Sequence, residues 1–226
     1  MKLYAIYCPT HLPKALFEEL VEQTDKLHQE CILKYRFQED QQRSLLGYLL
    51  SIYAIINHCD LRNQDISFSK NKYGKPFLKD HTNIHFNVSH SGSWIVCVIN
   101  TDIIGVDVEK VTSLTSDISD FNLSPRECAY ILSLGNEEQI DGFFDTWVLK
   151  ESYVKALGIG LCMPLNEFSI VKDSIGYSLD SSADNHFFLK QYAIDDGYKL
   201  AVCSKQDNFC QEITLVSIEE LVGVLL

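Results

Sequence analysis

The chain has 226 residues, of which 46% are hydrophobic and 22% charged, the proportions of an ordinary globular protein. These proportions exclude a fibre, a disordered tail and a bundle of membrane helices. Nineteen basic and 31 acidic residues give a net charge of −12, so we expect no general electrostatic affinity for nucleic acid or for an anionic membrane.

Cysteine usage and the N-terminus both bear on cellular location. The eight cysteines are dispersed, with no C-x-x-C pair and no cysteine–histidine cluster at zinc spacing. This predicts free, mostly buried thiols in a reducing compartment. The first apolar run, Leu3 to Cys8, is too short for a signal peptide, and no segment reaches about 18 consecutive apolar residues. We therefore expect a cytoplasmic protein.

The first half of the chain begins with a predicted strand at Leu3–Cys8, followed by mixed helical signals from Leu12 to Leu27. Asp40–His58 has an apolar stripe at helical spacing, which predicts an amphipathic helix with Arg43 in its first turn. An alternating pattern then predicts strands at Ile66–Ser69, Ile84–Val88, Trp94–Asn100 and Ile103–Glu109.

The second half begins with helices. Ser124-Pro-Arg-Glu127 is a capping box that opens a helix to about Leu134, and a second helix, from Glu137 or Ile140, ends at Leu157 before Gly158-Ile-Gly160. Strands are predicted at Phe168–Val171, Gly176–Leu179, Phe187–Ala193, Tyr198–Ser204 and Ile213–Ser217. This order predicts an α+β fold with antiparallel sheets. Gly92–Cys97 and Gly197–Cys203 are faintly alike, which hints at two related halves.

Two carboxylates in the strand Ile103–Glu109 are candidate metal ligands. Alternation places Asp107 and Glu109 on one face, with Cα atoms roughly 6.6 Å apart. Such a pair repels unless a hard cation with oxygen ligands lies between the carboxylates, and Gly105 leaves room for a ligand to approach. On the D-x-E pattern alone, a strand with one solvated face is the better explanation.

The helix that ends at Leu157 carries a third carboxylate. Glu151 follows Trp147 by four residues and therefore lies on the apolar face, where a charge needs a partner. The alternative is a surface ion pair between Glu151 and Lys155. An inward glutamate, an adjacent lysine and a D-x-E strand are the components of a Mg²⁺ site for phosphate transfer.

A basic segment completes the pattern. Residues 62–90 contain five Lys or Arg and two Asp, a local charge of +3 in an acidic chain. The turn Asn71–Pro76 and the polar loop Asn87–Gly92 are suited to cradling phosphates. Taken singly, Lys75 is more often a solvated turn residue and His90 a structural hydrogen-bonding group.

In this order, the motifs Tyr73-Gly-Lys-Pro76, Phe86-Asn-Val-Ser-His-Ser91, Ile104-Gly-Val-Asp-Val-Glu109 and Trp147-Val-Leu-Lys-Glu-Ser-Tyr-Val-Lys155 resemble the Sfp-type 4′-phosphopantetheinyl transferases. The resemblance covers almost the whole chain. It implies a pseudo-dimer of two similar α/β halves, residues 1–102 and 103–226, with coenzyme A in the cleft between them. Because one chain then contains the whole site, it also implies a monomer.

The resemblance implies that Asp107, Glu109 and Glu151 hold Mg²⁺ and that Glu151, Lys150 and Lys155 act at the reacting centre. It implies coenzyme A contacts at Arg43, Lys72, Tyr73, Gly74, Lys75, Pro76, Ser89, His90, Ser91 and Lys155. The chain departs from the family in two places. Val148 stands where a small residue is usual, and only Lys26, His28 or Lys34 could meet the 3′-phosphate.

The implied reaction moves 4′-phosphopantetheine from coenzyme A to a serine of an apo carrier protein of a peptide, polyketide or fatty-acid synthase, as in nonribosomal peptide and antibiotic biosynthesis. Glu151 or a metal-bound water would accept the serine proton. Residues 110–123, with Leu114, Ile118 and Phe121, form either a carrier-docking segment or a mobile loop with a short packed helix. The alternatives are a Mg²⁺-dependent pyrophosphate hydrolase and a non-catalytic module that binds coenzyme A or carrier.

Overall fold

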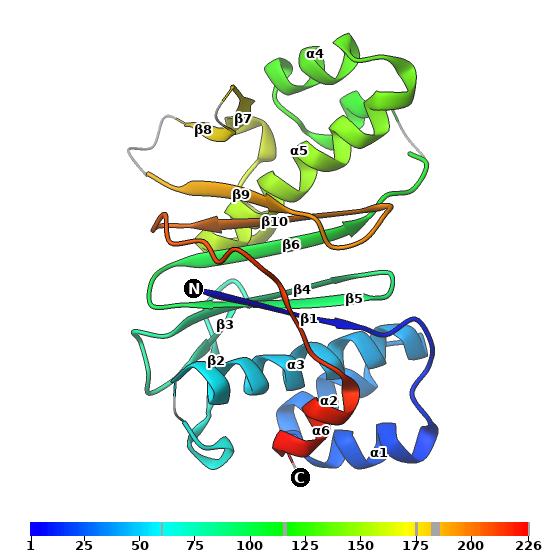
Figure 1. The fold of residues 1–226 in the computed structure, drawn as a ribbon, viewed down its shortest axis with the longest axis vertical. Helices are drawn as coiled ribbons and strands as arrows, with labels where there is room; N and C mark the ends of the chain where they lie inside the picture. The colour runs from blue at the N-terminus through cyan, green and yellow to red at the C-terminus, as the bar shows by residue number, and fades with distance from the viewer. Residues whose placement is uncertain (60, 115–116, 175, 182–185, 226) are drawn as a thin grey trace.

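The computed structural model describes residues 1–59, 61–114, 117–174, 176–181 and 186–225, which form two lobes stacked along the long axis (Figure 1). The first lobe has a four-stranded sheet in the order β11-β1-β5-β4. Its elements before the second lobe are β1 (Lys2–Tyr7), α1 (Lys14–Glu22), α2 (Lys26–Leu33), α3 (Gln38–Cys59), η1 (Asn63–Asp65), the hairpin β2 (Phe68–Lys70) and β3 (Pro76–Leu78), β4 (His85–Ser91) and β5 (Trp94–Asn100).

The second lobe has a three-stranded antiparallel sheet in the order β6-β10-β9. Its elements are β6 (Ile104–Lys110), η2 (Ile118–Phe121), α4 (Pro125–Ser133), α5 (Asn136–Leu157), η3 (Gly160–Cys162), η4 (Leu165–Glu167), the hairpin β7 (Phe168–Lys172) and β8 (Tyr177–Ser181), β9 (Phe188–Tyr192) and β10 (Tyr198–Ser204). The predicted capping box is present, since the hydroxyl of Ser124 accepts from the Glu127 amide and the Glu127 carboxylate accepts from the Ser124 amide.

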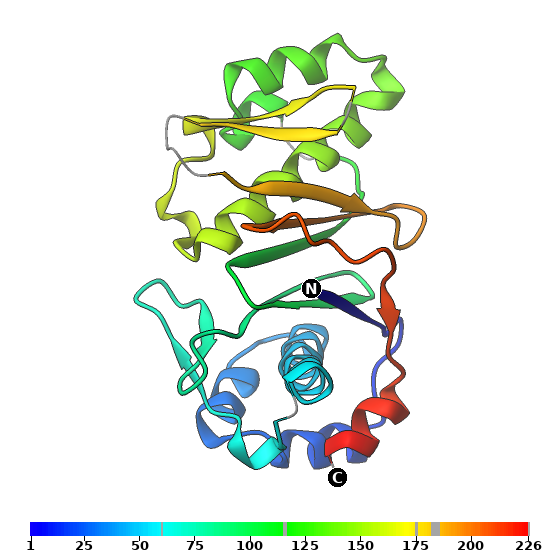
Figure 2. The same ribbon diagram turned by 60° about the vertical axis from the view of Figure 1, so that its left-hand side comes forward.

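The layers are stacked as helix, sheet, sheet and helix (Figure 2). Successive side chains of a strand point to opposite faces of its sheet, so each sheet packs against a different layer on each face. One face of the first sheet packs against α3 through Ile95 and Cys97. The opposite face packs against the second sheet through side chains such as Val96 and Val106. The far face of the second sheet, with Ala201, packs against α5. These layers confirm the predicted α+β fold.

The end of the chain returns to the first lobe. Strand β11 (Thr214–Leu215) pairs parallel with β1, and α6 (Ile218–Leu225) packs against α3 through Leu221 (Figure 1). The first sheet therefore contains a strand from the end of the sequence. The expected division at residue 102 places β11 and α6 in the second half, and the structure differs from it there.

The two faintly similar segments occupy equivalent places. Each begins at a glycine with positive φ, 55° at Gly92 and 73° at Gly197. Each continues into the central strand of its sheet, β5 between β1 and β4, and β10 between β6 and β9. This equivalence supports the prediction of two related halves.

The thiols are only partly as predicted. All eight cysteines are free, with Cys97 and Cys203 buried, Cys162 exposed and the others half-buried. No helix in the described part of the chain is long and apolar enough to cross a membrane.

Candidate active site

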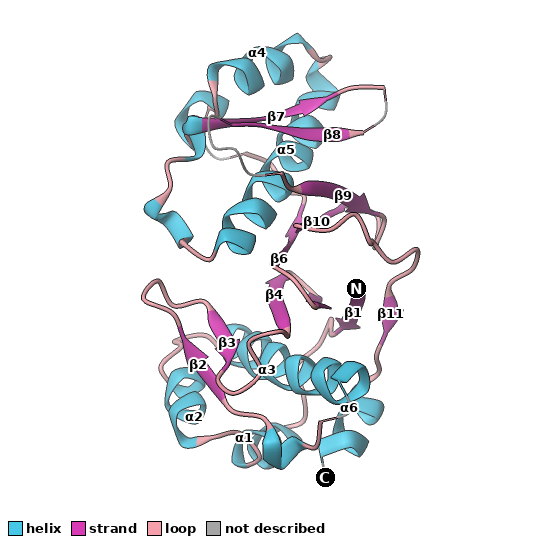
Figure 3. Cartoon of the chain, turned by 90° about the vertical axis from the view of Figure 1, so that its left-hand side faces the viewer, coloured by secondary structure: helices cyan, strands magenta, loops and turns pink. Residues whose placement is uncertain are grey.

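A pocket of about 860 Å³ is lined by residues of the β2–β3 hairpin, the first half of α3 and the end of α5. Figure 3 shows how these three elements are arranged in the two lobes. The sequence motifs for phosphate and metal binding therefore converge in space. One end of the pocket is lined by charged side chains from β6 and α5, and the other end by aromatic side chains from α2, α3 and the hairpin. Residues of both lobes line the pocket.

The charged end contains the three carboxylates that the sequence singled out. Asp107 and Glu109 face the pocket from β6, and Glu151 faces it from α5. The alternate residues Val106 and Val108 point into the core between the sheets, as the alternation predicts. The expectation for Gly105 is wrong. A Cβ there would lie 2.1 Å from the Ser152 carbonyl, so this glycine admits the close approach of α5 rather than a ligand.

The carboxylates lie in a partly desolvated, mutually repelling group. Asp107 is 2% exposed, and its Oδ1 atom accepts from the Ser89 hydroxyl at 2.8 Å and from the Lys155 ammonium. Burial, and then the charge of Asp107, raises the pKa of both Glu109 and Glu151 above the usual range. Asp107 Oδ2 is buried and has no hydrogen-bond partner within the described structure. An anionic oxygen in this state is suited to a cation.

Strand β4 holds β6 through side chains rather than through a backbone ladder. The amides of residues 106, 108 and 110 donate to Asn87 Oδ1 at 2.9 Å, Ser89 Oγ at 3.4 Å and Ser91 Oγ at 3.1 Å. Both strands are edges of their sheets, so these bonds satisfy donors that would otherwise lack partners. The hydroxyl of Ser91 also donates to Glu109 at 2.9 Å. The polar β4 motif therefore fixes the carboxylate strand.

The three carboxylates fit a metal only in combination with a ligand. Within the described residues, no group of three acidic, histidine or cysteine side chains forms a ready-made metal cage. One oxygen of Asp107 is already occupied by Ser89 and Lys155, and one oxygen of Glu109 by Ser91. The remaining hard oxygen donors match Mg²⁺, which usually binds through one or two carboxylates together with phosphate oxygens.

Two cations, Lys155 and Arg43, and the imidazole of His90 lie beside the carboxylates or face the same pocket. The ammonium of Lys155 lies 2.7 Å from Ser89 Oγ. Arg43 lines the pocket and is fixed by Asp40 at 2.8 Å and by the Gly92 carbonyl at 3.2 Å. Partial desolvation and then the charges of Lys155 and Arg43 lower the pKa of His90, which also lines the pocket. Its imidazole is therefore more easily neutral than an ordinary histidine.

Comparisons with known proteins cover the whole site. The family profile described as "4'-phosphopantetheinyl transferase, N-terminal" matches residues 13–102, and that of the 4′-phosphopantetheinyl transferase superfamily matches residues 103–203. The 4′-phosphopantetheinyl transferase Sfp of Bacillus subtilis is 36% identical over 223 residues, 98% of this chain and 100% of that protein. The chain belongs to the 4′-phosphopantetheinyl transferase family.

Relatives of lower identity are also described as phosphopantetheinyl transferases. The 4′-phosphopantetheinyl transferase gsp of Aneurinibacillus migulanus is 30% identical over 228 residues, 100% of this chain and 95% of that protein. The mouse L-aminoadipate-semialdehyde dehydrogenase-phosphopantetheinyl transferase is 27% identical over 230 residues, 90% of this chain and 74% of that protein. This chain is therefore an enzyme that transfers 4′-phosphopantetheine from coenzyme A to carrier proteins.

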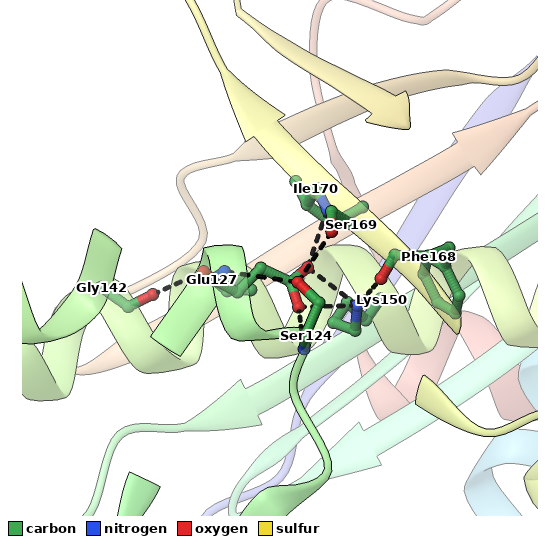
Figure 4. Close-up of polar contacts among 8 residues, drawn as sticks. Ser124, Glu127, Gly142, Lys150, Phe168, Ser169 and Ile170 are labelled. Carbon is green, nitrogen blue, oxygen red and sulfur yellow. Dashed lines mark hydrogen bonds and ion pairs between the residues drawn. The ribbon is translucent and has the colours of Figure 1, made fainter. Parts of the chain in front are cut away.

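Lys150 is not at the pocket of this transferase. It is fully buried between α5, α4 and β7, where its ammonium donates to both oxygens of Glu127 at 2.8 and 2.9 Å and to the Phe168 carbonyl at 2.7 Å (Figure 4). Glu127 also accepts from the amides of Ser124 and Ile170. The expectation that Lys150 acts at the reacting centre is corrected, because neighbours on the far side of α5 occupy its ammonium.

The hairpin residues have separate roles. Gly74 and Pro76 line the pocket, whereas Lys72 and Tyr73 are exposed, with the lysine ammonium 4.7 Å from the tyrosine ring centroid. The Lys75 ammonium donates to main-chain carbonyls of the second lobe. Ser91 likewise points to Glu109 and is absent from the pocket lining. Of the expected coenzyme A contacts, the pocket brings together Arg43, Gly74, Pro76, Ser89, His90 and Lys155.

Of the three candidate residues for the 3′-phosphate, His28 lines the pocket, at its aromatic end. The ring of His28 stacks on the ring of Tyr48, with their centroids 4.0 Å apart. Lys26 and Lys34 are exposed and do not line the pocket. Burial lowers the pKa of His28, so its imidazole favours the neutral form. Val148, the other departure, is buried in the core between α5 and the second sheet and does not touch the pocket.

Sequence reasoning missed the structural partners of the site. The pKa of Glu109 is also influenced by a hydrogen bond from Trp147, which the sequence assigned only to packing. The amide oxygen of Asn87 was not predicted to hold β6, and Asn71 was not predicted to bind α5. The regular spacing of Asn87, Ser89 and Ser91 against 106, 108 and 110 is the signal that could have indicated the first of these contacts.

Proposed function

We propose that this transferase acts through Mg²⁺ held by Asp107, Glu109 and Glu151 on the pyrophosphate of coenzyme A. The observation that carries the proposal is the unpartnered, buried Oδ2 atom of Asp107, beside two carboxyls of raised pKa. When bound, the metal supplies positive charge to the pyrophosphate and removes the repulsion among the carboxylates.

In the proposed reaction, the hydroxyl oxygen of a carrier serine bonds to the β-phosphorus of coenzyme A, and the bond from that phosphorus to the bridging oxygen breaks. Adenosine 3′,5′-bisphosphate leaves with the bridging oxygen and its electron pair. Lys155, whose ammonium already lies beside Asp107 and Ser89, stabilises the negative charge on the leaving phosphate. His90 and Arg43, on the same pocket wall, bind the phosphates.

Glu151 is proposed as the base that accepts the serine proton. Its raised pKa makes it a stronger proton acceptor than an exposed glutamate. Its position four residues before Lys155 on α5 places the base and the cation on the same face of one helix. One rigid element would therefore position both groups.

The adenosine end of coenzyme A is proposed to occupy the inner, aromatic end of the pocket, where Tyr48, Phe68 and Phe86 supply apolar and stacking surface. His28 is the nearest candidate for the 3′-phosphate, and its tendency to be neutral predicts a weak contact. Because both lobes of one chain line this pocket, we propose that the monomer is active.

Mass spectrometry tests the function. The chain is incubated with coenzyme A, Mg²⁺ and a panel of apo carriers from peptide, polyketide and fatty-acid synthases. We expect a gain of roughly 340 Da on the carrier, the mass of the phosphopantetheinyl group. Release of free phosphopantetheine without modified carrier would instead identify a hydrolase. Binding of coenzyme A with no product from any carrier would identify a non-catalytic module, and either result would overturn the proposal.

A further inference from the structure

The side chain of Lys75 leaves the hairpin and enters the second lobe. Its ammonium donates to the carbonyls of Ile104 at 3.0 Å, Lys155 at 2.6 Å and Ala156 at 3.1 Å. An ammonium has only three N–H donors. All three have main-chain acceptors here, so none is left for a phosphate oxygen.

Two of the three acceptors, the carbonyls of Lys155 and Ala156, lie in the last turn of α5, where a cation is favourable. Helix α5 ends at Leu157, and the carbonyls of its last turn have no partner within the helix. A positive charge at this end also interacts favourably with the helix dipole. Lys75 therefore caps α5 from another lobe, 80 residues away in sequence from one of its acceptors.

A second hairpin residue makes the same connection. Asn71 donates its side-chain amide to the Gly158 carbonyl at 2.7 Å, and its Oδ1 atom accepts from the amides of Tyr73 and Lys75 at 2.9 and 3.0 Å. Asn71 therefore shapes the turn and attaches it to α5. Gly158 has φ 68°, and a Cβ on it would lie 2.8 Å from the Lys75 stem, so the glycine leaves space for the lysine.

These contacts connect the two sides of the active site. The hairpin contributes Gly74 and Pro76 to the pocket wall. Lys155 accepts from Lys75 through its main-chain carbonyl, and its own side-chain ammonium contacts Asp107 and Ser89. We propose that Lys75 is a positioning residue, which ties the hairpin to the end of α5 and thereby fixes Lys155 at the metal-binding carboxylates. This inference rests on the proposed role of Lys155 and gives Lys75 a different role from that of a phosphate ligand.

Lys75→Met tests the inference. Lys79→Met is the matched control, because Lys79 is an exposed lysine that directly follows β3 of the same hairpin. We expect Lys75→Met to lower kcat at least about tenfold, because small displacements of a catalytic group are costly. The Kd for coenzyme A should change by a smaller factor than kcat, since no phosphate contact is lost. A fall in coenzyme A affinity with unchanged kcat would overturn the proposal in favour of a phosphate ligand.

A double-mutant cycle with Lys155→Met tests whether Lys75 acts through Lys155. In the Lys155→Met background, Lys75→Met should change kcat by less than about twofold. Multiplication of the two single-mutant effects would show that Lys75 acts by another route and would overturn the proposal.

Amide hydrogen exchange measures the attachment of the hairpin to α5 without an activity assay. It therefore remains informative if the transfer reaction itself is not observed. Lys75→Met should accelerate amide exchange in the last turn of α5 and leave α3 unchanged. Asn71→Ala, which retains the lysine, should accelerate the same amides to a smaller extent and serves if Lys75→Met does not fold. Unchanged exchange in the last turn of α5 in both variants would overturn the inference.

Discussion

The hydroxyl of Ser89 on β4 donates to the carboxylate of Asp107 on β6 at 2.8 Å, so the two lobes meet at a proposed metal ligand. The same oxygen of Ser89 accepts from the Lys155 ammonium and from the Val108 amide. A single buried hydroxyl therefore orients the carboxylate, the cation and the strand that carries the carboxylate. The active site depends on the junction between lobes as much as on either lobe.

Ser89→Ala should consequently reduce kcat/KM by about 10–100-fold, because a hydrogen bond to a charged group contributes roughly 1.5–3 kcal/mol. The substitution leaves the Val108 amide without its acceptor and Asp107 with only Lys155 on that oxygen. Steady-state transfer assays at saturating Mg²⁺ measure the effect. Ser133→Ala, at an exposed position on α4, is the control and should be unchanged. Equal activity of the two variants would contradict the role of Ser89.

Glu151→Gln separates proton transfer from metal binding. The amide retains the shape of the side chain but cannot accept the serine proton, so we expect kcat to fall by about 10²–10⁴-fold with Mg²⁺ saturating. A Mg²⁺ titration of the variant establishes that saturation. Turnover close to wild type under these conditions would show that another group, such as a metal-bound water, is the base.

Local sequence signals predicted much of the fold and the acidic end of the site. The capping box at Ser124 and the shared face of Asp107 and Glu109 depend on neighbours within a few residues, and both are present. The roles of Lys75 and Lys150 depend on carbonyl and carboxylate partners far away in the sequence. A lysine in a motif has the same local pattern whether its ammonium meets a phosphate or a buried main-chain oxygen. The return of α6 to α3 was missed for the same reason.

Lys150→Met should destabilise the second lobe rather than disable its chemistry directly. Removing one partner of a buried ion pair leaves Glu127, which is 2% exposed, as an uncompensated charge, at a cost of about 3–5 kcal/mol in the free energy of unfolding. Urea unfolding measures this change, and Lys172→Met at an exposed lysine is the control. If Lys150→Met loses transfer activity with unchanged unfolding free energy, a direct role at the reacting centre returns.

Leu114→Asp tests carrier docking by residues 110–123, of which 115 and 116 lie outside the described residues. Leu114 is half-buried and, like Phe121 and Trp147, packs against the apolar cluster that contains Phe143. We expect its substitution to raise the KM for the carrier at least about fivefold, because apolar contact area is lost, and to leave the KM for coenzyme A unchanged.

Leu132→Asp is the matched control for docking, since Leu132 is 62% exposed on α4 and should tolerate the charge. Phe121→Asp is a poorer test, because Phe121 packs 4.7 Å from Phe143 and 6.1 Å from the pocket residue Trp147. Parallel increases in both KM values for Leu114→Asp would indicate disruption of that cluster rather than loss of a docking contact.

Glu109→Gln should stabilise the metal-free protein at neutral pH. Burial and then Asp107 raise the pKa of Glu109 above its ordinary value of 4.5. A carboxyl with a higher pKa in the folded state loses stability as pH rises from the unfolded value through the folded value. At pH 7 the charged group therefore opposes folding, and its removal should raise Tm.

Thermal unfolding across pH and ligand conditions measures this effect. The higher Tm of Glu109→Gln relative to wild type should disappear at pH values below the ordinary pKa, where Glu109 is protonated in both the folded and unfolded states. Glu212→Gln, at an exposed position, is the control and should not raise Tm at pH 7. With Mg²⁺ and coenzyme A together, wild type should gain more stability than Glu109→Gln, because only wild type retains all three carboxylates. An equal gain in both proteins would show that Glu109 does not contribute to metal binding.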